Sequence, residues 1–415
     1  MKLISVVFYN IDTYFIFIYN LIGDRMKKTI LDYSYNGKKV IMRCDFNVPI
    51  ENGIITDDTR ILASLKSINY LINNGAKVIL LSHLGKVKTL HDKEINNLYP
   101  VYKRLKELLS VNVYFSEYTR GIELENMISD LNNGEVLLIQ NTRYEDYPDK
   151  LESGCDDVLS RYWASLGDIF INDAYGTSHR AHASNVGISK YLPNGVGFLV
   201  QEEILKLDSI MNDHVSPFIV IMGGKKISDK TLVIDNLITK CDKILIGGGM
   251  CFTFLKALGI NVGESIVDDD NISYCKNILD KYSDKIILPI DIVLNDGDVV
   301  DINMIPNDKI GFDIGPKTIK LFTDELSLAK KVIINGPMGV FEEERFSYGT
   351  NAIYDTLVLN NVKTLVGGGD SAASVNLLGF SDKFYHVSTG GGATLEYLSG
   401  KVLPGIDVIN EKNEK

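Results

Sequence analysis

Cationic and polar side chains follow several short apolar runs in the first half of the sequence, where they could bind a small anion. Arginine guanidinium groups pair with phosphate or carboxylate oxygens in a fork geometry, so cations gathered in one place suit a multiply charged anion. We therefore expect Arg60, His83, Arg143 and Arg180 to form an anion site. The segments concerned are Arg43–Pro49, Thr56–Arg60, Ser82–Lys86, Gln140–Arg143 and Asn172–His182.

Each motif alone also has an ordinary explanation. A single Arg at a helix start is usually a solvated charge, and a single His is usually a core or surface residue. His179 and His182 are three residues apart, but no third metal ligand stands at a suitable spacing, so we do not predict a metal site there. Asp45-Phe46-Asn47 is similar to the D-F-G motif of protein kinases, but neither an H-R-D loop nor a glycine-rich phosphate loop accompanies it.

The second half places lysines and glycines after its apolar runs. Lys226 and Lys230 are four residues apart and would share a face if a helix begins there. Asn335–Glu342 and Gly367–Ser371 follow later runs. Glycine turns let backbone N–H groups approach a phosphate, and a neighbouring carboxylate can hold Mg²⁺, although a single glycine triplet is as readily explained by a tight turn. Neither G-x-G-x-x-G nor G-x-x-x-x-G-K-[ST] occurs, so the common dinucleotide and P-loop interpretations lose their main support.

The elements that must position these side chains alternate between strand and helix. This alternation predicts parallel sheets covered on both faces, in which ligands gather at the carboxyl ends of the strands. The expected helices are Arg60–Asn73, Val101–Leu109, Gln201–Met211, Leu232–Thr239 and Phe252–Leu258. The expected strands are Lys39–Met42, Lys77–Leu81, Val136–Ile139, Ile169–Ile171, Phe218–Ile221, Lys243–Ile246, Lys285–Leu288, Lys331–Ile334 and Lys363–Val366.

Composition limits the class of protein. The length of 415 residues suggests two or three domains, and 45% hydrophobic with 23% charged residues is ordinary for a folded, soluble protein. A net charge of -11 argues against a general nucleic-acid or membrane-surface binder, because the long-range field repels polyanions. The five cysteines are scattered and form no C-x-x-C pair, which is typical of reduced thiols in the cytoplasm.

Domain boundaries are expected where the composition changes. Residues 1–25 are interpreted as an extension of doubtful role: Leu3–Ile22 is largely apolar, but Asp12 near its centre argues against a membrane anchor. We favour a dispensable extension or a misplaced start codon. We expect a first domain over 26–200, a helix and linker over 201–216, a second domain over 217–402, and a tail, 403–415, that packs back on the first domain.

In this order the segments resemble phosphoglycerate kinase from about Met26 to the end of the sequence. The resemblance implies two Rossmann-like α/β domains, each a mainly parallel sheet flanked by helices, joined by a hinge helix. It also implies a cytoplasmic monomer that transfers a phosphoryl group, with Mg²⁺, between 1,3-bisphosphoglycerate plus ADP and 3-phosphoglycerate plus ATP, without a nucleic-acid or membrane partner. The most specific stretches are Asp45–Pro49, Ile55–Arg60, Ser82–Gly85, Asn172–Ser184, Gly247–Leu255, Asn335–Glu342, Gly367–Ala373 and Ser388–Ala393.

The resemblance also implies roles for individual residues. In the first domain Asp45 and Asn47 would contact the glycerate, Arg60 would lie near the carboxyl group where transfer occurs, and His83, Arg143 and Arg180 would hold the other phosphate. Phe46, Leu84, Gly85 and Lys86 would complete this site. In the second domain Lys226 and Lys230 would meet the nucleotide phosphates, Glu342 the ribose, and Asp370 the Mg²⁺, while the glycine turns would line the nucleotide. The nucleotide set also includes Gly248, Gly311, Asn335, Gly368, Gly369 and Ser371, and the catalytic set is Arg60, Lys226 and Gly369.

Several positions depart from the family pattern. Lys86 and Val87 stand where His-Leu-Gly is normally followed by Arg-Pro, and Lys225 replaces a small residue. A catalytically silent homologue that serves as a scaffold is the main alternative, and a nucleotide-linked dehydrogenase is a weaker one. Retention of the whole set Arg60, Lys226, Glu342 and Asp370 argues against the silent homologue.

Overall fold

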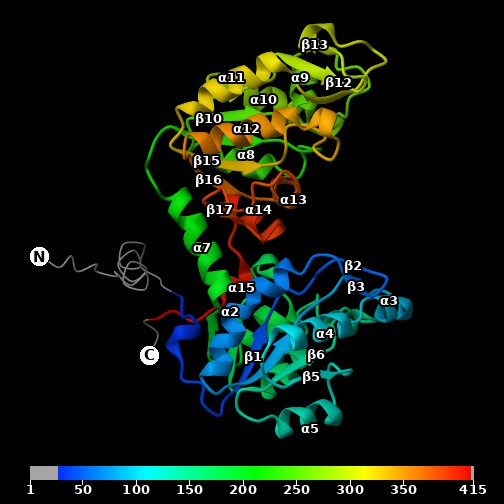
Figure 1. The fold of residues 1–415 in the computed structure, drawn as a ribbon, viewed down its shortest axis with the longest axis vertical. Helices are drawn as coiled ribbons and strands as arrows, with labels where there is room; N and C mark the ends of the chain where they lie inside the picture. The colour runs from blue at the N-terminus through cyan, green and yellow to red at the C-terminus, as the bar shows by residue number, and fades with distance from the viewer. Residues whose placement is uncertain (1–26, 413–415) are drawn as a thin grey trace, which may run out of the picture.

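The structure is a computed structural model that describes residues 27–412, so our interpretation of residues 1–25 lies outside the described residues. The described chain forms two lobes stacked along the long axis and joined by helix α7 (Phe198–Met211) (Figure 1). We call the part that carries strands β1 to β8 the first lobe, and the part that carries strands β9 to β17 the second lobe. Each lobe is built around a six-stranded sheet.

The first lobe contains an all-parallel sheet in the order β5-β6-β4-β1-β7-β8. Its central strands read as continuous apolar runs because both faces are covered: Val78 and Leu80 belong to one buried cluster, while Ile79 and Leu81 belong to another. The strands are β1 (Lys39–Arg43), β4 (Lys77–Leu81), β5 (Val113–Ser116), β6 (Val136–Ile139), β7 (Ile169–Asn172) and β8 (Asn194–Val196). The helices are α2 (Thr59–Asn73), α3 (Leu90–Ile95), α4 (Tyr99–Leu108), α5 (Ile122–Asp130) and α6 (Asp157–Ser165).

The second lobe repeats this plan with the order β11-β10-β9-β15-β16-β17, again all parallel. Alternate residues of its central strand again enter separate clusters, Val220 on one face and Ile219 and Ile221 on the other. The strands are β9 (Phe218–Met222), β10 (Lys243–Ile246), β11 (Ile286–Ile287), β15 (Lys331–Asn335), β16 (Lys363–Val366) and β17 (His386–Val387). The helices are α8 (Thr231–Leu237), α9 (Cys251–Ala257), α10 (Ile272–Tyr282), α11 (Pro316–Ser327), α12 (Tyr348–Leu359), α13 (Gly369–Leu377) and α14 (Gly392–Leu398).

The predicted fold class, two mainly parallel sheets flanked by helices, is confirmed, and each of the predicted strands overlaps an observed one. The elements that were not predicted are short or have exposed residues. They include β5, β8, β17, the hairpin of β2 (Ile50–Glu51) and β3 (Ile54–Ile55), and a small antiparallel sheet of β12 (Asp291–Leu294), β13 (Val299–Asp301) and β14 (Gly311–Ile314).

The chain crosses between the lobes a second time after α14, and helix α15 (Pro404–Asp407) then lies against the first lobe (Figure 1). Asn172 Nδ2 donates a 2.7 Å hydrogen bond to the carbonyl oxygen of Gly405. The backbone N–H of Lys28 donates to the carbonyl oxygen of Asn410 at 2.7 Å. Residues 404–410 are therefore part of the packing around β7 and β8.

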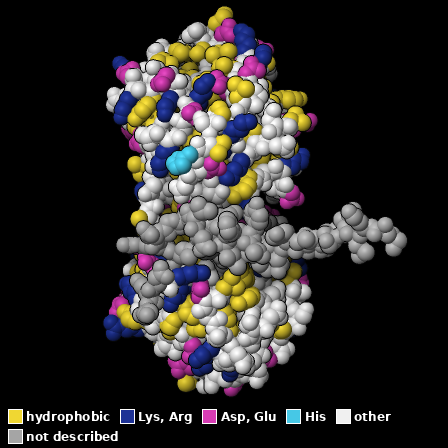
Figure 2. Space-filling view, turned by 90° about the vertical axis from the view of Figure 1, so that its left-hand side faces the viewer, with side chains coloured by type: hydrophobic (Ala, Val, Ile, Leu, Met, Phe, Trp, Pro, Cys, Tyr) yellow, Lys and Arg dark blue, Asp and Glu magenta, His cyan; other side chains and the backbone are white. Residues whose placement is uncertain are grey.

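On the face shown in Figure 2, positive and negative side chains are interspersed over the described surface of both lobes. Among residues 27–412, no helix combines the length and the apolar character that a bilayer crossing requires.

Candidate active site

A pocket of about 320 Å³ opens at the carboxyl ends of the first-lobe strands, and we call it the basic pocket. Of the first-lobe residues expected to bind an anion, all except Phe46 and Leu84 line it. Its cationic residues are Arg60, Lys86, Arg143 and Arg180, against a single lining carboxylate. The lining residues are Asp45, Asn47, Arg60, His83, Gly85, Lys86, Arg143, Gly176, Thr177, His179, Arg180 and Gly390–Gly392.

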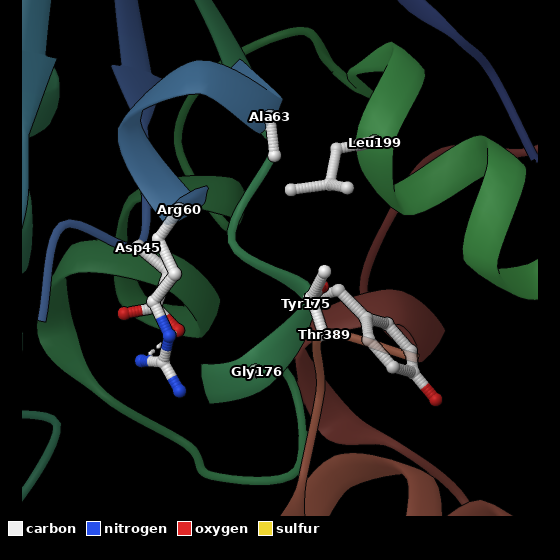
Figure 3. A pocket seen from close by; sticks show the side chains of 7 residues that line it. All are labelled: Asp45, Arg60, Ala63, Tyr175, Gly176, Leu199 and Thr389. Carbon is white, nitrogen blue, oxygen red and sulfur yellow. Dashed lines mark hydrogen bonds and ion pairs between the residues drawn. The ribbon is translucent and has the colours of Figure 1, made fainter. Parts of the chain in front are cut away.

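Arg60 is held at the start of α2 and pairs with the one lining carboxylate. Its Nη1 lies 3.0 Å from Asp45 Oδ2 and 3.3 Å from the carbonyl oxygen of Asn47. Figure 3 shows this pair beside a smaller hollow that Tyr175 and Thr389 also line. The Arg60 side chain remains 37% exposed, so its guanidinium can still meet a ligand.

Phe46 and Leu84 lie behind the pocket lining and fix the turns on either side of it. Both side chains are buried in the core. The N–H of Phe46 donates to Ser82 Oγ at 2.8 Å, and the N–H of Leu84 donates to Asn141 Oδ1 at 3.1 Å. The adjacent Gly85 has φ +60°, and a Cβ there would come within 2.2 Å of Asn96 Oδ1, so the turn requires glycine.

His83, one of the two histidines that line the pocket, is uncharged at neutral pH. Burial lowers the pKa of His83 well below its usual range, and the nearby Arg43 and Arg143 guanidinium groups lower it further. Burial, together with Arg143 and Arg43, lowers the pKa of His182 to about 2. The positive charge of the pocket therefore comes from its arginines and Lys86, while His83 offers a neutral ring.

Two further arginines complete the cationic wall. Arg143 lies in the 3-10 helix Thr142–Asp146 and makes a 2.7 Å ion pair with Asp146 Oδ2, with both side chains buried. Arg180 Nε donates to His179 Nε2 at 3.0 Å. His179 and His182, considered as a metal pair, have no third partner: the described residues contain no group of three or more His, Cys, Asp or Glu placed to hold a metal ion.

The second lobe contributes the turn Gly390–Gly392 to this same pocket. The glycine turns of the second half were expected to line the nucleotide, and this one lies beside the arginines. A Cβ at Gly390 would come within 2.1 Å of Tyr175 Cε1, so only glycine allows the approach. The preceding Thr389 donates through its N–H and its Oγ1 to Glu203 of α7, at 2.7 and 2.8 Å. No sequence signal links Thr389 to Glu203, because they lie 186 residues apart.

A second group of predicted residues gathers at the carboxyl ends of β9, β10, β15 and β16, and we call it the glycine-rich edge. Gly336 has φ +107°, and a Cβ there would come within 2.3 Å of the Gly223 backbone. A Cβ at Gly248 would come within 2.5 Å of the N of Gly224. The N–H of Gly336 donates to Ser371 Oγ at 2.6 Å, and Asn335 Nδ2 donates to the carbonyl oxygen of Gly367 at 3.2 Å. These turns pack backbone against backbone, which side chains would prevent.

Lys230 is buried in this edge, whereas Lys226 is exposed. Lys230 Nζ donates to the carbonyl oxygens of Gly223 and, at 3.0 Å, of Asn335. Burial lowers the pKa of Lys230 to about 8, although the charge of Asp370 partly opposes the shift. Lys226 and Lys230 would share a face only if a helix carried both, and this condition is not met, because α8 begins at Thr231 with Lys230 as its N-cap.

The remaining predicted residues surround this edge. Gly368 is the N-cap of α13 with φ +96°, and around Gly369 a Cβ would meet open space. Gly311 lies on β14 against the Phe252 ring, and Glu342 is exposed in the turn after β15.

The carboxylate expected to hold Mg²⁺, Asp370, is exposed in the first turn of α13. A Cβ at Gly224 would lie 3.1 Å from Lys230 Nζ and 3.9 Å from Asp370 Oδ2, so both charges face one turn. Mg²⁺ favours one or two carboxylates together with water and substrate phosphates, and a single exposed carboxylate beside a cation fits that chemistry.

Comparisons with known proteins agree over nearly the whole chain. The family pattern described as phosphoglycerate kinase matches residues 30–401. The phosphoglycerate kinase of Fusobacterium nucleatum is 52% identical over 93% of this chain and 100% of its own length, and that of Enterococcus faecalis is 51% identical over the same shares. The solved structure of phosphoglycerate kinase from Coxiella burnetii aligns with a TM-score of 0.82 at 31% identity, covering 92% of this chain and 98% of that one. The structure from Pyrococcus horikoshii gives a TM-score of 0.80 at 30% identity, with the same coverage.

Proposed function

The chain belongs to the phosphoglycerate kinase family, and we propose that the basic pocket holds its phosphoglycerate and the glycine-rich edge its nucleotide. The enzyme transfers a phosphoryl group, with Mg²⁺, between 1,3-bisphosphoglycerate plus ADP and 3-phosphoglycerate plus ATP in glycolysis and gluconeogenesis. In the direction that consumes ATP, the acceptor is a carboxyl group.

The observation that carries the first assignment is the cationic wall of the basic pocket around a neutral histidine. Arg143, Arg180 and Lys86, with His83, suit the phosphate that is not transferred, because arginine forks match its oxygens. Asp45 and Asn47 would contact the glycerate. Arg60, which pairs with Asp45 and remains partly exposed, would meet the carboxyl group.

The second assignment rests on backbone geometry. At Gly369, in the first turn of α13, a Cβ would meet open space, so a phosphate could approach the backbone there, where the N–H groups and the helix dipole favour negative charge. Lys226 and Lys230 would bind the phosphates, Asp370 would hold the Mg²⁺ of the nucleotide, and Glu342 would bind the ribose. Gly248, Gly311, Asn335, Gly368, Gly369 and Ser371 would line the base and the phosphates.

The reaction needs no general base, because the attacking carboxylate is already ionised at neutral pH. This agrees with a site made of cationic and hydrogen-bonding groups. Catalysis then consists of aligning the two substrates and neutralising the charge on the group in transfer. Arg60 would approach that group from the first lobe, and Lys226 and the Gly369 turn from the second. Mg²⁺, when bound with the nucleotide, supplies further charge neutralisation.

We place the domains at 26–200 and 217–402, with 201–216 as the hinge helix and linker and 403–415 returning to the first domain. Lys226 and Gly369 do not line the basic pocket. Closure of the two lobes would bring both residues toward Arg60. Closure would also exclude water and prevent hydrolysis of ATP. We place the enzyme in the cytoplasm as a monomer, which size-exclusion chromatography with light scattering would check.

The test is a coupled assay of the purified chain with Mg²⁺, ATP and 3-phosphoglycerate, following NADH oxidation through glyceraldehyde-3-phosphate dehydrogenase. We expect robust turnover that Arg60→Ala reduces by about 100-fold or more, as for loss of a charge-stabilising group. Arg161→Ala, which removes an exposed arginine paired with Asp157, is the matched control and should keep full turnover. A folded protein that binds MgATP without turnover would instead be a silent homologue.

A further inference from the structure

Four side chains that are distant in the sequence form a buried hydrogen-bonded chain behind the basic pocket. Arg43, Glu152 and Ser184 are completely buried, and His83 is 8% exposed. Ser184 Oγ bonds to Glu152 Oε1, Arg43 Nε lies 2.8 Å from Ser184 Oγ, and Arg43 Nη2 lies 3.3 Å from His83 Nδ1. Only His83 among these four lines the pocket.

The donor direction of every bond in this chain is forced. An arginine guanidinium has donors and no acceptor, so Arg43 must donate both to Ser184 Oγ and to His83 Nδ1. The Ser184 hydroxyl accepts from Arg43 and donates its own proton to Glu152 Oε1. Glu152 Oε2 accepts the backbone N–H of Ser184 at 2.9 Å, so this carboxylate is an acceptor on both oxygens.

The same bonds indicate which ring nitrogen of His83 carries the proton. A ring that accepts at Nδ1 and is uncharged must be protonated at Nε2. The competing arrangement would have an Nδ1–H donate to Asp45 Oδ1, but that separation is 3.9 Å, beyond hydrogen-bonding reach. Arg43 at 3.3 Å is therefore the nearer and geometrically better partner.

We propose that Glu152, Ser184 and Arg43 act as positioning residues that fix His83 in the Nε2–H tautomer, so that the ring presents a hydrogen-bond donor to an anion in the basic pocket. The opposite tautomer would aim a nitrogen lone pair at the phosphate and repel it. The assignment deepens the proposed role of the basic pocket and depends on it for the identity of the anion.

The tautomer can be measured directly on the intact chain labelled with ¹⁵N-histidine, using two-bond ¹H–¹⁵N correlation spectra at pH 7. The chain has 6 histidines, and the His83→Gln variant identifies the His83 signals by their loss. We expect His83 to show a protonated Nε2 and an unprotonated Nδ1. A protonated Nδ1, or a doubly protonated ring, would overturn the proposal.

The role of the chain of bonds is tested with Ser184→Ala, which removes its middle member without adding bulk. We expect the KM for 3-phosphoglycerate to rise by about tenfold, as for a weakened hydrogen bond to a charged group, and His83 to show a mixture of tautomers. MgATP affinity should not change. Ser160→Ala is the control, because this serine is equally buried in the same lobe but bonds only to the carbonyl oxygen of Asp156.

The outcomes separate the two proposals. A parent enzyme with the expected tautomer but no turnover would contradict the proposed function and leave the tautomer assignment standing. A Ser184→Ala variant with unchanged tautomer and unchanged KM would contradict the positioning role even if the enzyme is fully active. A rise in KM that Ser160→Ala reproduces would reduce the effect to general loss of stability and would also contradict it.

Discussion

At Lys86 the basic pocket carries an ammonium group where the family pattern has a guanidinium. An ammonium is a point charge, whereas a guanidinium binds two phosphate oxygens at once. We predict that Lys86→Arg lowers the KM for 3-phosphoglycerate by about threefold, the gain expected from one additional charge-assisted bond. Lys88→Arg, at an exposed neighbouring position, is the control. An unchanged KM in Lys86→Arg would show that the planar fork has no role here.

Lys230 predicts a pH dependence of nucleotide binding. Burial lowers its pKa to about 8, so the ammonium loses its proton as the pH rises through that value. Only the protonated form attracts phosphate, so the affinity for MgADP should be constant below pH 7 and should fall between about pH 7 and 9. Calorimetric titration across this pH range measures the affinity for MgADP. In Lys226→Met, which removes the exposed lysine, affinity should fall without moving the midpoint; a midpoint that moves would assign the titration to Lys226.

Sequence reasoning located the pocket residues that directly follow strands and missed those that act through others. Arg60, His83, Arg143 and Arg180 could be found because the carboxyl ends of parallel strands meet at one edge. Arg43 begins the segment Arg43–Pro49 that the sequence analysis selected. No pattern in the sequence predicts its contact with Ser184, which is 141 residues away. The approach of Gly390 to Tyr175 depends on how the two lobes meet, which local patterns do not encode.

Among the elements, α7 is anchored at both ends. Asp173 of the first lobe accepts the N–H groups of Leu199 and Val200, at 2.9 and 3.3 Å, at its N-terminus. Lys331 of the second lobe donates to the carbonyl oxygen of Ile210 at 3.0 Å near its C-terminus. A carboxylate at the N-terminus and an ammonium at the C-terminus both complement the helix dipole. Relative motion of the lobes should therefore leave these helix ends attached.

The buried cap Asp173 predicts a pH dependence of stability. Burial raises its pKa from 3.8 to about 6, so the ionised carboxylate is disfavoured in the folded state. This group contributes stability at low pH that is lost as the pH rises from about 4 to about 6. Over that pH range the free energy of unfolding of the parent protein should fall by up to about 3 kcal/mol relative to that of the Asp173→Asn variant.

Urea unfolding followed by the fluorescence of Trp163 measures this difference. Trp163 is the single tryptophan of the chain and is buried in the first lobe, so it reports on the lobe that contains Asp173. Parallel stability curves for the two proteins between pH 4.5 and 7.5 would show that Asp173 does not titrate in this window.

Helices and strands were predictable where they carry a long buried face. Strand β1 and helix α2 were predicted to within a residue, because their apolar periodicity is clear. Strands β12, β13 and β14 were not, because they are short and the residues of β13 are half-exposed or exposed. Antiparallel strands on an exposed edge follow turn geometry, which one sequence specifies weakly.

At the scale of the whole molecule, the basic pocket needs both lobes. We predict that Gly390→Ala lowers kcat by about tenfold or more, because the added Cβ would come within 2.1 Å of Tyr175 and must push the second-lobe turn away. The affinity for MgATP and the melting temperature should change little. Gly379 has a positive φ, which Gly390 does not, and a Cβ there would meet open space, so Gly379→Ala tests backbone strain without a clash between the lobes. Equal losses of kcat in both variants would contradict this account.

The return of residues 404–410 to the first lobe has a consequence for how the protein is made. The carbonyl oxygen of Gly405 receives the side-chain amide of Asn172, next to the α7 cap Asp173, and Asn410 receives the N–H of Lys28. During translation, Lys28 and Asn172 are synthesised before Gly405 and Asn410, so these bonds cannot form until the end of the chain has been made. The strands of both sheets are synthesised before residue 404, so these contacts are the last part of the first lobe to become available. A chain that ends within the second lobe therefore lacks contacts that complete the packing of the first lobe as well.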